Sequence, residues 1–496
     1  MAVVLGSAVH CTIEHIPHVY CAAEGDCADS APYVHCDVMH HSCVIPDGGG
    51  GNGGDGGGVG PDMICGSSAE CSDVAPICFV GRCRACEGAG DDPQCVAHDS
   101  TTPRCNAPTG QCVACLMSAD CPKAAPVCNV ANFTCHKCVA HSECSSGICD
   151  TTNGTCVDAT DIAYVNNASG ACSDTMHAST PTMPYCQIQY AASNAPQKFI
   201  LVSGSATAYN ALALNATTTA IGPLTIVGPA GRGTAMKATV TSTTLPALFA
   251  STTAAALTLT VDGLDFIGAS GAAANAEGIK CQGGSATATL TIKNSTIEMS
   301  GTNGVNSSGC VLALDASIIS ANASEGVLVA SSTYVITNNI IHHNGSNSGL
   351  SGVNIDAAST GTFAFNTVAA NGGANAAFGG IVCAANGSNK LIEDSIVAQN
   401  AASPMSNGSQ FTGKCQLQSV VPGPDAFSGA IQMAPAFLSI TDFHLDTTGG
   451  ALATNQACCI DKLAGATTPN ATHDVDFGPR PKVPGGKLDI GAHEAQ

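Results

Sequence analysis

After Asp158, the chain consists of short apolar runs that are separated by Gly and Asn and that recur about every 21 to 33 residues. Within a run, apolar residues alternate with polar ones, as at Leu290 and Ile292, which is the pattern of a strand with one buried face. Each run is followed by a polar or Gly step, a second short strand, an Asn/Gly/Ser turn and often a third strand such as "GVLVA". Three short strands per repeat predict a parallel β-helix. The runs are "LTLTVDGLDFIGASG" from Leu257, "LTIKNSTIEMSGTNG" from Leu290, "LALDASIISANASEG" from Leu312, "YVITNNIIHHNGSNSG" from Tyr334, "FAFNTVAANGGANA" from Phe363 and "LIEDSIVAQNA" from Leu391.

The coils of such a β-helix stack about 4.8 Å apart, so Ile, Val and Leu side chains form continuous interior ladders. Asn side chains at the turns can stack in the same way and satisfy backbone groups. Cys281 in "GIKC" and Cys383 in "GIVC" occupy the coil position that carries Val329 and Ile355 in other repeats. We therefore predict that both cysteines are interior residues that behave as small hydrophobic side chains and, being several coils apart, do not pair with each other.

The cysteines define a second, different region. Of the 29 cysteines, 21 lie between Cys11 and Cys156. They form units of four, the last four units are joined by CxxC steps, and Cys11 is left over. Phrases such as "AECSDVAP" and "ADCPKAAP" recur around the second cysteine of a unit. The units are Cys21, Cys27, Cys36, Cys43; Cys65, Cys71, Cys78, Cys83; Cys86, Cys95, Cys105, Cys112; Cys115, Cys121, Cys128, Cys135; and Cys138, Cys144, Cys149, Cys156.

Two CxxC pairs between Cys112 and Cys138, nineteen residues apart, also have the spacing of a four-thiolate zinc site. A zinc site would leave Cys121 and Cys128 without a role, whereas a four-cysteine unit closes two internal bridges. Loops this rich in Pro, Gly and Asn bury little apolar surface, and a bridge that closes ~15 residues contributes about 3 kcal/mol. We therefore predict disulfides in an oxidising compartment rather than zinc. The connectivity within a unit stays open among three patterns.

These textures divide the chain into four segments. Residues 1–45 hold the first cysteine-rich unit, residues 46–62 a Gly-rich linker, residues 63–158 four tandem units and residues 159–496 the β-helix with its cap and closing segment. The linker fragment "GGNGGDGGG" fits a calcium-binding β-roll repeat, but it occurs once and lacks the bulky apolar residue of each roll turn, so we interpret it as a flexible spacer. The predicted fold class is all-β, a parallel β-helix solenoid preceded by a small disulfide-rich repeat region.

Three stretches resemble known families. The cysteine-rich units resemble repeats of large secreted bacterial surface proteins and, more distantly, the Dickkopf-type cysteine-rich domain. The segment "IAYVNNASGACSDTMHASTPTMPYCQIQYAASNA" resembles the opening of right-handed β-helix proteins of the pectin-lyase-like class. The segment "THDVDFGPRPKVPGGKLDIGAHE", residues 472–494, is similar to the terminal motif of bacterial β-helix proteins called choice-of-anchor Q. The β-helix resemblances cover residues from about 160 onward and imply a right-handed helix, a capping helix within residues 185–195 and a bridge between Cys172 and Cys186.

Composition narrows the functional classes. The formal net charge of −21, from 16 Lys+Arg against 37 Asp+Glu, argues against nucleic acid as a partner. No run approaches the ~20 apolar residues of a transmembrane helix. The first residues, "MAVVLGSAV", are apolar but short and lack Lys and Arg, so they indicate either the remnant of a secretion signal or a misplaced start. With the cysteine pattern, we expect an extracellular or cell-surface location.

Catalysis by the fold class needs residues that this chain supplies sparsely. Pectate and pectin lyases use an Arg or Lys to remove the proton next to a uronate carboxylate, usually beside calcium held by clustered carboxylates. No arginine lies between Arg232 and Arg480, and the Asp residues lie about one per coil, mostly at turns, where Asx turns are their common role. The Gly-His-Gly and Arg-x-Lys strings of polygalacturonase-type hydrolysis are absent. The remaining catalytic candidates are Lys280, Lys293 and Asp265.

Two adjacent pairs carry potential chemistry. His342 and His343 lie in "IIHHNG", where neighbouring residues of a strand point to opposite faces, so we do not expect both to bind one ion. A solvated histidine at a turn edge is the simpler interpretation. Cys458 and Cys459 could form a redox pair, but adjacent cysteines rarely reach good disulfide geometry, so we expect partners elsewhere in the tail.

The sequence therefore favours a secreted or cell-surface binding or structural protein, adhesin-like, whose β-helix flank contacts glycans or another surface polymer. Asn, Ser and Thr can hydrogen-bond sugar hydroxyls, while an aromatic content of 4% without Trp leaves no strong stacking platform, so we expect weak sites and avidity from many copies. The alternative is an extracellular polysaccharide lyase or hydrolase, because fold alone does not decide function. We expect no cofactor and no bound metal, with calcium required only in the lyase alternative.

Overall fold

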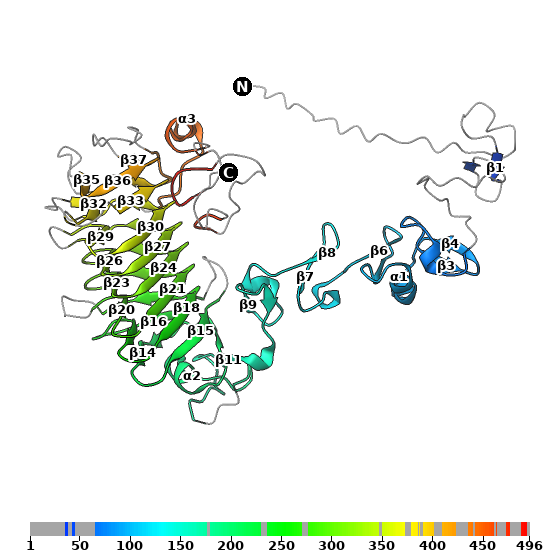
Figure 1. Cartoon of the computed structure of the whole chain (residues 1–496), viewed down its shortest axis with the longest axis horizontal. Coiled ribbons are helices and arrows are strands. Elements are labelled where there is room, and N and C mark those ends of the chain that lie inside the picture. Colours follow the sequence, from blue (N-terminus) through cyan, green and yellow to red (C-terminus); the bar gives the residue numbers. More distant parts are fainter. Residues whose placement is uncertain are drawn as a thin grey trace, which may run out of the picture. The chain divides into compact units, whose positions relative to one another are not determined.

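The computed structural model shows two compact bodies (Figure 1). Of the described residues, the N-terminal body holds those up to residue 100 and residues 105–112, and the main body holds residues 101–104 and those from 113 onward. Cys11, the linker and most of the first cysteine-rich unit lie outside the described residues, apart from strands β1 (His35–Asp37) and β2 (Ser42–Val44), which pair antiparallel. The structure describes residues 35–37, 42–44, 65–175, 179–229, 236–269, 276–346, 350–372, 378–384, 386, 390–400, 409–422, 435–439, 442–460, 463, 473–476 and 488–493.

Each described cysteine-rich unit folds as a short helical turn followed by an antiparallel hairpin, and its bridges join the first cysteine to the third and the second to the fourth. The disulfide-rich region predicted from the sequence is thereby confirmed. The elements are η2 (Ser68–Glu70), β3 (Ile77–Phe79), β4 (Arg82–Arg84), η3 (Ala89–Asp91), α1 (Asp92–His98), β5 (Arg104–Asn106), β6 (Gln111–Val113), η4 (Ser118–Asp120), β7 (Val127–Asn129), β8 (Thr134–His136), η5 (His141–Glu143), β9 (Cys149–Asp150), β10 (Thr155–Cys156) and η6 (Ala159–Asp161). The bridges are Cys65–Cys78, Cys71–Cys83, Cys86–Cys105, Cys95–Cys112, Cys115–Cys128, Cys121–Cys135, Cys138–Cys149 and Cys144–Cys156.

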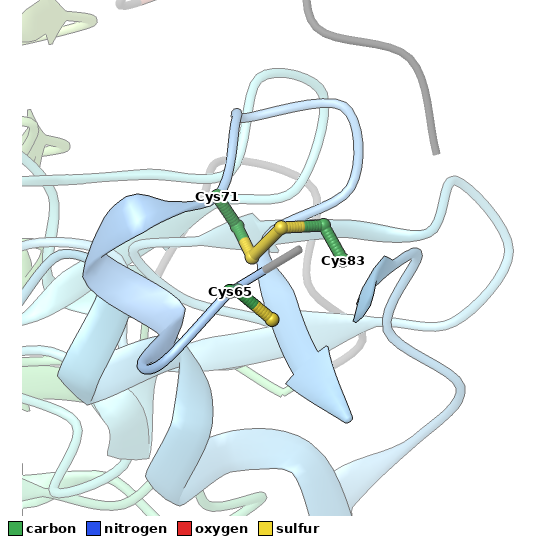
Figure 2. A group of neighbouring side chains, drawn as sticks. All are labelled: Cys65, Cys71 and Cys83. Atoms are coloured by element: carbon green, nitrogen blue, oxygen red, sulfur yellow. A yellow bond between two sulfur atoms is a disulfide. The ribbon is translucent and has the colours of Figure 1, made fainter. Parts of the chain in front are cut away.

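The two bridges of a unit lie side by side, so sulfurs gather without forming a metal site. The sulfurs of Cys65, Cys71 and Cys83 lie within 4.8 Å of one another. Figure 2 shows Cys71 bonded to Cys83, while Cys65 is bonded to Cys78. The two CxxC pairs of the zinc alternative are divided among four different bridges, so they supply no thiolates to a common ion.

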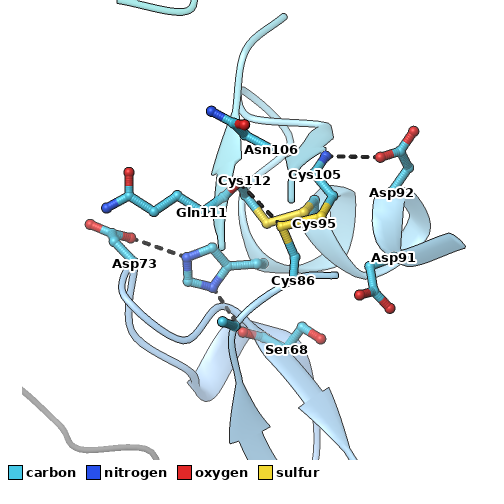
Figure 3. The surroundings of a disulfide bond; sticks show 12 residues. Ser68, Asp73, Cys86, Asp91, Asp92, Cys95, Cys105, Asn106, Gln111 and Cys112 are labelled. Atoms are coloured by element: carbon cyan, nitrogen blue, oxygen red, sulfur yellow. Dashed lines mark hydrogen bonds and ion pairs between the residues drawn. A yellow bond between two sulfur atoms is a disulfide. The ribbon is translucent and has the colours of Figure 1, made fainter. Parts of the chain in front are cut away.

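Polar contacts add to the bridges inside the N-terminal body. At the end of α1, His98 Nδ1 donates to the carbonyl oxygen of Ser68 over 2.9 Å, and its Nε2 lies 3.1 Å from Asp73 Oδ1 (Figure 3). Arg84 forms a two-point contact with Asp91, at 2.9 and 2.7 Å. Because the histidine belongs to one cysteine-rich unit and its partners to the preceding one, these contacts hold successive units together.

The residues from Ile162 onward form three parallel sheets, and successive coils add one strand to each sheet (Figure 1). Sheet 1 is 10-stranded and consists of β11 (Ile162–Val165), β12 (Phe199–Val202), β15 (Ile221–Val227), β18 (Leu257–Asp262), β21 (Ala288–Lys293), β24 (Val311–Asp315), β27 (Thr333–Thr337), β30 (Thr360–Ala364), β33 (Lys390–Glu393) and β36 (Cys415–Gln418). Sheet 2 is 9-stranded and consists of β13 (Tyr209–Asn210), β16 (Thr239–Thr241), β19 (Asp265–Ile267), β22 (Thr296–Glu298), β25 (Ile318–Ser320), β28 (Ile340–His342), β31 (Thr367–Ala369), β34 (Ile396–Ala398) and β37 (Val421–Pro422). Sheet 3 is 8-stranded and consists of β14 (Leu212–Ala216), β17 (Leu248–Thr252), β20 (Ile279–Gln282), β23 (Val305–Ser308), β26 (Val327–Ala330), β29 (Val353–Ile355), β32 (Phe378–Cys383) and β35 (Ser409–Gly413).

Apolar side chains form ladders inside this parallel β-helix. Leu259, Leu290, Leu312 and Tyr334 are in register on successive strands of sheet 1, and each is at most 1% exposed. Short turns connect sheet 1 to sheet 2 through a left-handed residue that recurs from coil to coil. A non-glycine residue in that conformation costs on the order of 1 kcal/mol, which the stacking of the turns must offset. These residues are Asn294 (φ 47), Ala316 (φ 45), Asn338 (φ 58), Phe365 (φ 55) and Asp394 (φ 49).

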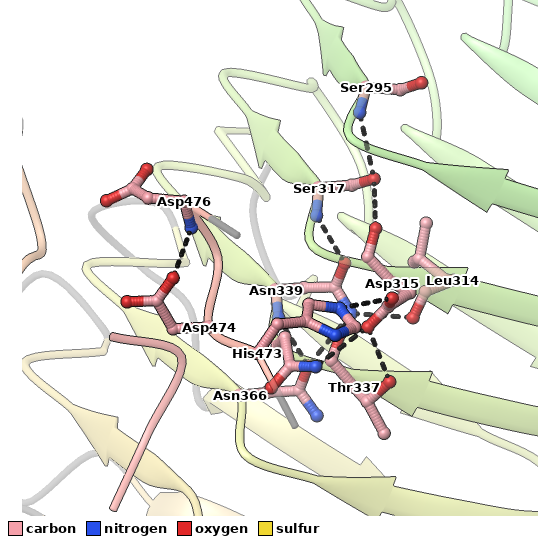
Figure 4. Close-up of polar contacts among 11 residues, drawn as sticks. Ser295, Leu314, Asp315, Ser317, Thr337, Asn339, Asn366, His473, Asp474 and Asp476 are labelled. Atoms are coloured by element: carbon pink, nitrogen blue, oxygen red, sulfur yellow. Dashed lines mark hydrogen bonds and ion pairs between the residues drawn. The ribbon is translucent and has the colours of Figure 1, made fainter. Parts of the chain in front are cut away.

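Two ladders of buried polar side chains run along the turns and satisfy backbone N–H groups of the preceding coil. The backbone N–H of Ser317 donates to Asn339 Oδ1 over 2.9 Å, and that of Asn339 donates to Asn366 Oδ1 over 3.0 Å (Figure 4). The stacked Asn turns predicted from the sequence are therefore present. The first ladder contains Ser295, Ser317, Asn339, Asn366 and Ser395, and the second contains Ser300, Asn322, Asn344, Asn371, Asn400 and Gln410.

Segments at both ends of the β-helix pack onto it. Helix α2 (Ile188–Asn194) contacts β11, β12 and β14 at the first coils, and Cys172 is bonded to Cys186 nearby. The described residues from 435 onward, which include α3 (Gly449–Cys458), form a closing segment over the outer face of sheet 2. There Phe443 and Val475 pack against the buried Ile340 and Ala369. Among the described residues, no helix combines the length and apolarity needed to cross a membrane.

One prediction about cysteines is confirmed in part, because Cys281 and Cys383 are interior residues, and a second prediction was wrong. Cys281 and Cys383 do not pair with each other, but they are not free either, because Cys281 is bonded to Cys310 and Cys383 to Cys415. The partners belong to the next coil and lie at or beside the turn that leads into sheet 1, where no repeat marks a cysteine position. Cys458 and Cys459 are bonded to each other rather than to distant partners. Helix α3 ends between them, so the backbone changes direction at that step.

Candidate functional site

The three catalytic candidates lie on three different sheets and do not form one constellation. Asp265 is on β19 of sheet 2, where its Oδ2 lies 2.9 Å from Lys237 Nζ. Lys280 is on β20 of sheet 3, with its Nζ 3.4 Å from Oε1 of the buried Glu277. Lys293 is on β21 of sheet 1. Asp265 and Lys280 are thus held in local ion pairs, whereas Lys293 has no ion-pair partner among the described residues.

Lys293 lines a pocket of about 210 Å³ between the outer face of sheet 1 and the last cysteine-rich unit, which we call the junction pocket. It is formed because the last unit docks on the sheet, where Ile148 and Val157 pack against the buried Ile162 and Val227. Both the unit and the sheet belong to the main body. The lining residues are His141, Cys149, Asp150, Thr151, Thr152, Phe199, Thr225, Thr260, Asp262, Thr291 and Lys293.

The β-helix register places the lining of sheet 1 in two columns. Phe199, Thr225, Thr260 and Thr291 are in register on four successive strands. Two residues further along each strand, and therefore on the same face, Val227, Asp262, Lys293 and Asp315 form the second column. The strings "LTLTVD" and "LTIK" thus present a hydroxyl and a charged group to the pocket from each strand.

The last cysteine-rich unit contributes a histidine in a defined tautomer. The backbone N–H of Cys149 donates to His141 Nδ1 over 3.0 Å, so the proton of the neutral imidazole lies on Nε2. That Nε2 lies 3.3 Å from Asp262 Oδ2. The second carboxylate of the pocket, Asp150, comes from the last cysteine-rich unit. It accepts from the backbone N–H of Thr152 at 3.1 Å and from Asn153 Nδ2 at 2.6 Å. Both carboxylates of the pocket are thus hydrogen-bonded within the protein.

The ammonium of Lys293 and the hydroxyls of Thr225, Thr260 and Thr291 have no hydrogen-bond or ion-pair partner among the described residues. All four side chains are half-buried. Buried polar groups usually find partners, because an unpaired donor loses the hydrogen bonds that it makes in water. A row of unused donors in one hollow therefore indicates a surface that is solvated in the free protein and that can hydrogen-bond a ligand.

Asp315, the register neighbour of Lys293 on the next strand of sheet 1, contacts the closing segment. His473 Nε2 lies 2.8 Å from Asp315 Oδ2, and Asp315 Oδ1 accepts from Thr337 and Asn338 at 2.9 Å each (Figure 4). Burial raises the pKa of Asp315, but these contacts outweigh burial and hold its pKa below the usual value. Asp315 is therefore an ionised structural carboxylate that fastens the closing segment to the β-helix.

A second titratable cluster lies under the closing segment. The Nδ1 atoms of His342 and His343 are 2.8 Å apart, so our prediction that the pair points to opposite faces was wrong. The reason is that β28 ends at His342 and His343 has a left-handed backbone (φ 54), which turns its side chain back toward its neighbour. Burial beside His343 lowers the pKa of His342 to about 4, so this imidazole is neutral at pH 7.

The closing segment itself contains a charged histidine. His444 Nδ1 contacts Asp442, and its Nε2 lies 3.0 Å from Asp476 Oδ2. Burial lowers the pKa of His444, but the contacts with Asp476 and Asp442 outweigh it and raise the pKa to about 9. The two carboxylates lie at opposite nitrogens of the ring, so the group is an ion-pair cluster, and it does not present three ligands to one metal ion.

A larger and more open hollow of about 600 Å³ lies between α2 and the turn that joins β14 to β15. Lys198 is the one charged residue among its lining residues. The junction pocket is smaller, yet it combines a cation, two carboxylates, an imidazole and a row of hydroxyls. We therefore regard the junction pocket as the candidate functional site.

Comparisons with known proteins support the fold. Residues 277–421 match the model of the right handed beta helix region, which confirms the predicted right-handed parallel β-helix, and residues 51–162 match a family of unknown function, DUF8331. No curated protein matches the chain. The crystal structure of pectate lyase Pel9A is similar at a TM-score of 0.36 and 13% sequence identity, covering 68% of this chain and 99% of that chain. The chain is thus similar to right-handed β-helix proteins over residues 277–421.

Proposed function

We propose that the protein works outside the cell, secreted or displayed on a cell surface, and that it binds extracellular polysaccharide without cleaving it. The described cysteines from Cys65 to Cys459 are all in disulfides, as expected in an oxidising compartment. The polymer is the class of ligand that a long, repetitive flank of hydroxyl and amide groups can contact at several points.

The junction pocket carries this proposal. It offers an unpaired ammonium and three unpaired hydroxyls on one face, which are donors that a carbohydrate can use. The separation of Lys280, Lys293 and Asp265 on three sheets favours binding over turnover, because proton abstraction needs a base and its supporting groups around one reacting atom. The alternative function is a polysaccharide lyase or hydrolase. It would require one of these three residues to act as the base with other supporting groups gathered around it.

The test is a panel of neutral and uronate-containing polysaccharides, assayed for retention by affinity electrophoresis and for turnover by the absorbance of unsaturated products and by new reducing ends. Each assay is run with and without calcium. We expect retention of at least one polymer without turnover. Cleavage of any polymer that is lost on Lys280→Met or Lys293→Met would replace the binding function by the lyase or hydrolase.

Retention should be weak for a single copy. The pocket is small, and Phe199 is the one aromatic residue in its lining, so each site offers a few hydrogen bonds and little stacking. Many copies on one surface would then determine the overall strength, because linked weak sites gain 10²–10⁴-fold in avidity. Immobilising the protein at increasing density should therefore increase retention steeply.

A further inference from the structure

We propose that the junction pocket binds one neutral, hydroxyl-rich sugar residue and discriminates against uronates, an inference that rests on the proposed function. The pocket contains the groups that such a residue needs within one hollow: Lys293 and the Thr225, Thr260 and Thr291 hydroxyls as donors, and Asp262 as acceptor. The ligand class follows from the hydrogen-bonding capacity, the charge and the size of this pocket.

The hydrogen-bonding capacity fits a diol. Lys293 and Asp262 are register neighbours on adjacent strands, which lie about 4.8 Å apart. The ammonium of Lys293 donates hydrogen bonds, whereas the carboxylate of Asp262 accepts them. Two neighbouring hydroxyls of a sugar ring can accept from the ammonium through one oxygen and donate to the carboxylate through the other. A carboxylate or a phosphate group has no hydrogen-bond donor to offer to the Asp262 carboxylate.

The charge of the pocket also disfavours an anion. The lining of the pocket contains two carboxylates, Asp150 and Asp262, and one ammonium, that of Lys293. The pocket is therefore formally negative by one charge, in a protein whose net charge is −21. A uronate carboxylate drawn to Lys293 would lie one strand away from Asp262 on one side and from Asp315 on the other. Repulsion from both would offset the attraction to Lys293.

The size and the walls fit a single ring. The volume of about 210 Å³ is below the ~300–1,000 Å³ that is usual for drug-sized ligands, so a monosaccharide unit fits and a longer oligosaccharide does not. Phe199 begins the threonine column and offers an apolar surface to the C–H groups of a ring. The last cysteine-rich unit, through His141 and Thr151, forms the opposite wall, so the site exists only where this unit docks on the β-helix.

The experiment measures retention of the full chain on neutral galactans, xylans, mannans and glucans and on polygalacturonate and alginate, at low and high salt. The test variants are Thr291→Val and Lys293→Met, which remove a donor with little change in shape. The matched controls are Thr258→Val, on the same strand as Thr260 but outside the lining, and Lys198→Met in the larger hollow. Circular dichroism and thermal unfolding establish that each variant folds.

We expect retention on a neutral polymer that varies little with salt, about a fivefold loss for Thr291→Val and roughly tenfold or more for Lys293→Met, and no loss for the controls. Binding of uronate polymers alone would overturn the inference and leave polysaccharide binding standing. So would neutral binding that both test variants retain, or that Lys198→Met abolishes. No retention on any polymer, at any density of immobilised protein, would reject the proposed function and this inference with it.

Discussion

Asn344 is the residue at which the stability of the β-helix can be tested most directly. Its side-chain Oδ1 accepts from the backbone N–H of Asn322 over 3.1 Å and from Asn322 Nδ2 over 2.8 Å. Its Nδ2 donates to the carbonyl oxygens of Ile319 and His342, at 2.9 and 3.0 Å, and to Asn371 Oδ1 at 2.9 Å. The side chain therefore bridges three successive coils, and Asn344→Ala removes all five contacts in a site that is 1% exposed.

The expected cost follows from which groups are left without a partner. The Asn322 N–H has no other acceptor among the described residues, and leaving it buried and unpaired costs about 1–3 kcal/mol. Ile319 O and Asn371 Oδ1 each lose one donor, at about 1 kcal/mol apiece. His342 O retains a bond from the backbone N–H of Ala321. The sum predicts that Asn344→Ala lowers the free energy of unfolding by about 3–5 kcal/mol.

The assay is equilibrium unfolding in guanidinium chloride, evaluated by linear extrapolation, together with amide exchange of the coils on either side. The control is Asn210→Ala, because Asn210 is exposed and an exposed substitution changes stability by no more than about 0.5 kcal/mol. A loss of less than 1 kcal/mol for Asn344→Ala, at an unchanged denaturant slope, would refute the view that the polar ladder stabilises the stack.

Two further predictions concern the closing segment and the thiols. Since the pKa of His444 is raised to about 9, its ion pairs stabilise the fold fully below the unfolded pKa near 6.5 and lose this effect as the pH rises through 9. Proteolysis of the closing segment should therefore accelerate above pH 9 in the native protein, and a pH-independent rate, or the same rise in His444→Gln, would contradict the assignment. Thiol titration of the denatured, unreduced protein should detect at most the five cysteines before Cys65, and a larger number, or bound zinc, would reverse the disulfide assignment.

Much of the fold can be predicted from local sequence pattern, because each coil must bury one face of its short strands and pair the backbone groups of its turns. The alternation in "LTLTVD" and "LTIK" sets which side chains enter the core, and the Asn positions mark the turns, so strands, stacking and polar ladders all follow from short windows of sequence. Cys310 and Cys415 show where this reasoning stops. They lie at or beside turns of variable length, where the period that places Cys281 and Cys383 gives no information.

The candidate site depends on contacts that no local pattern encodes. Lys293 was a candidate from its residue type, and the threonine column could have been found by aligning the outward positions of successive strands. His141 could not, because it lies 121 residues before Asp262 and reaches it only when the last cysteine-rich unit docks on the sheet. The contact between His473 and Asp315 could not be predicted either, because His473 lies 158 residues after Asp315 and reaches it only when the closing segment packs on the β-helix.

These two histidines together explain why Lys293 is available to a ligand. Lys293 stands between Asp262 and Asp315 on adjacent strands, and at that spacing a lysine would attract each carboxylate by on the order of 3 kcal/mol near a protein surface. Both carboxylates are instead engaged, Asp262 by His141 and Asp315 by His473 and two neighbouring side chains. The β-helix supplies a regular column of charges, and the two segments that dock on it determine which of those charges remains unpaired.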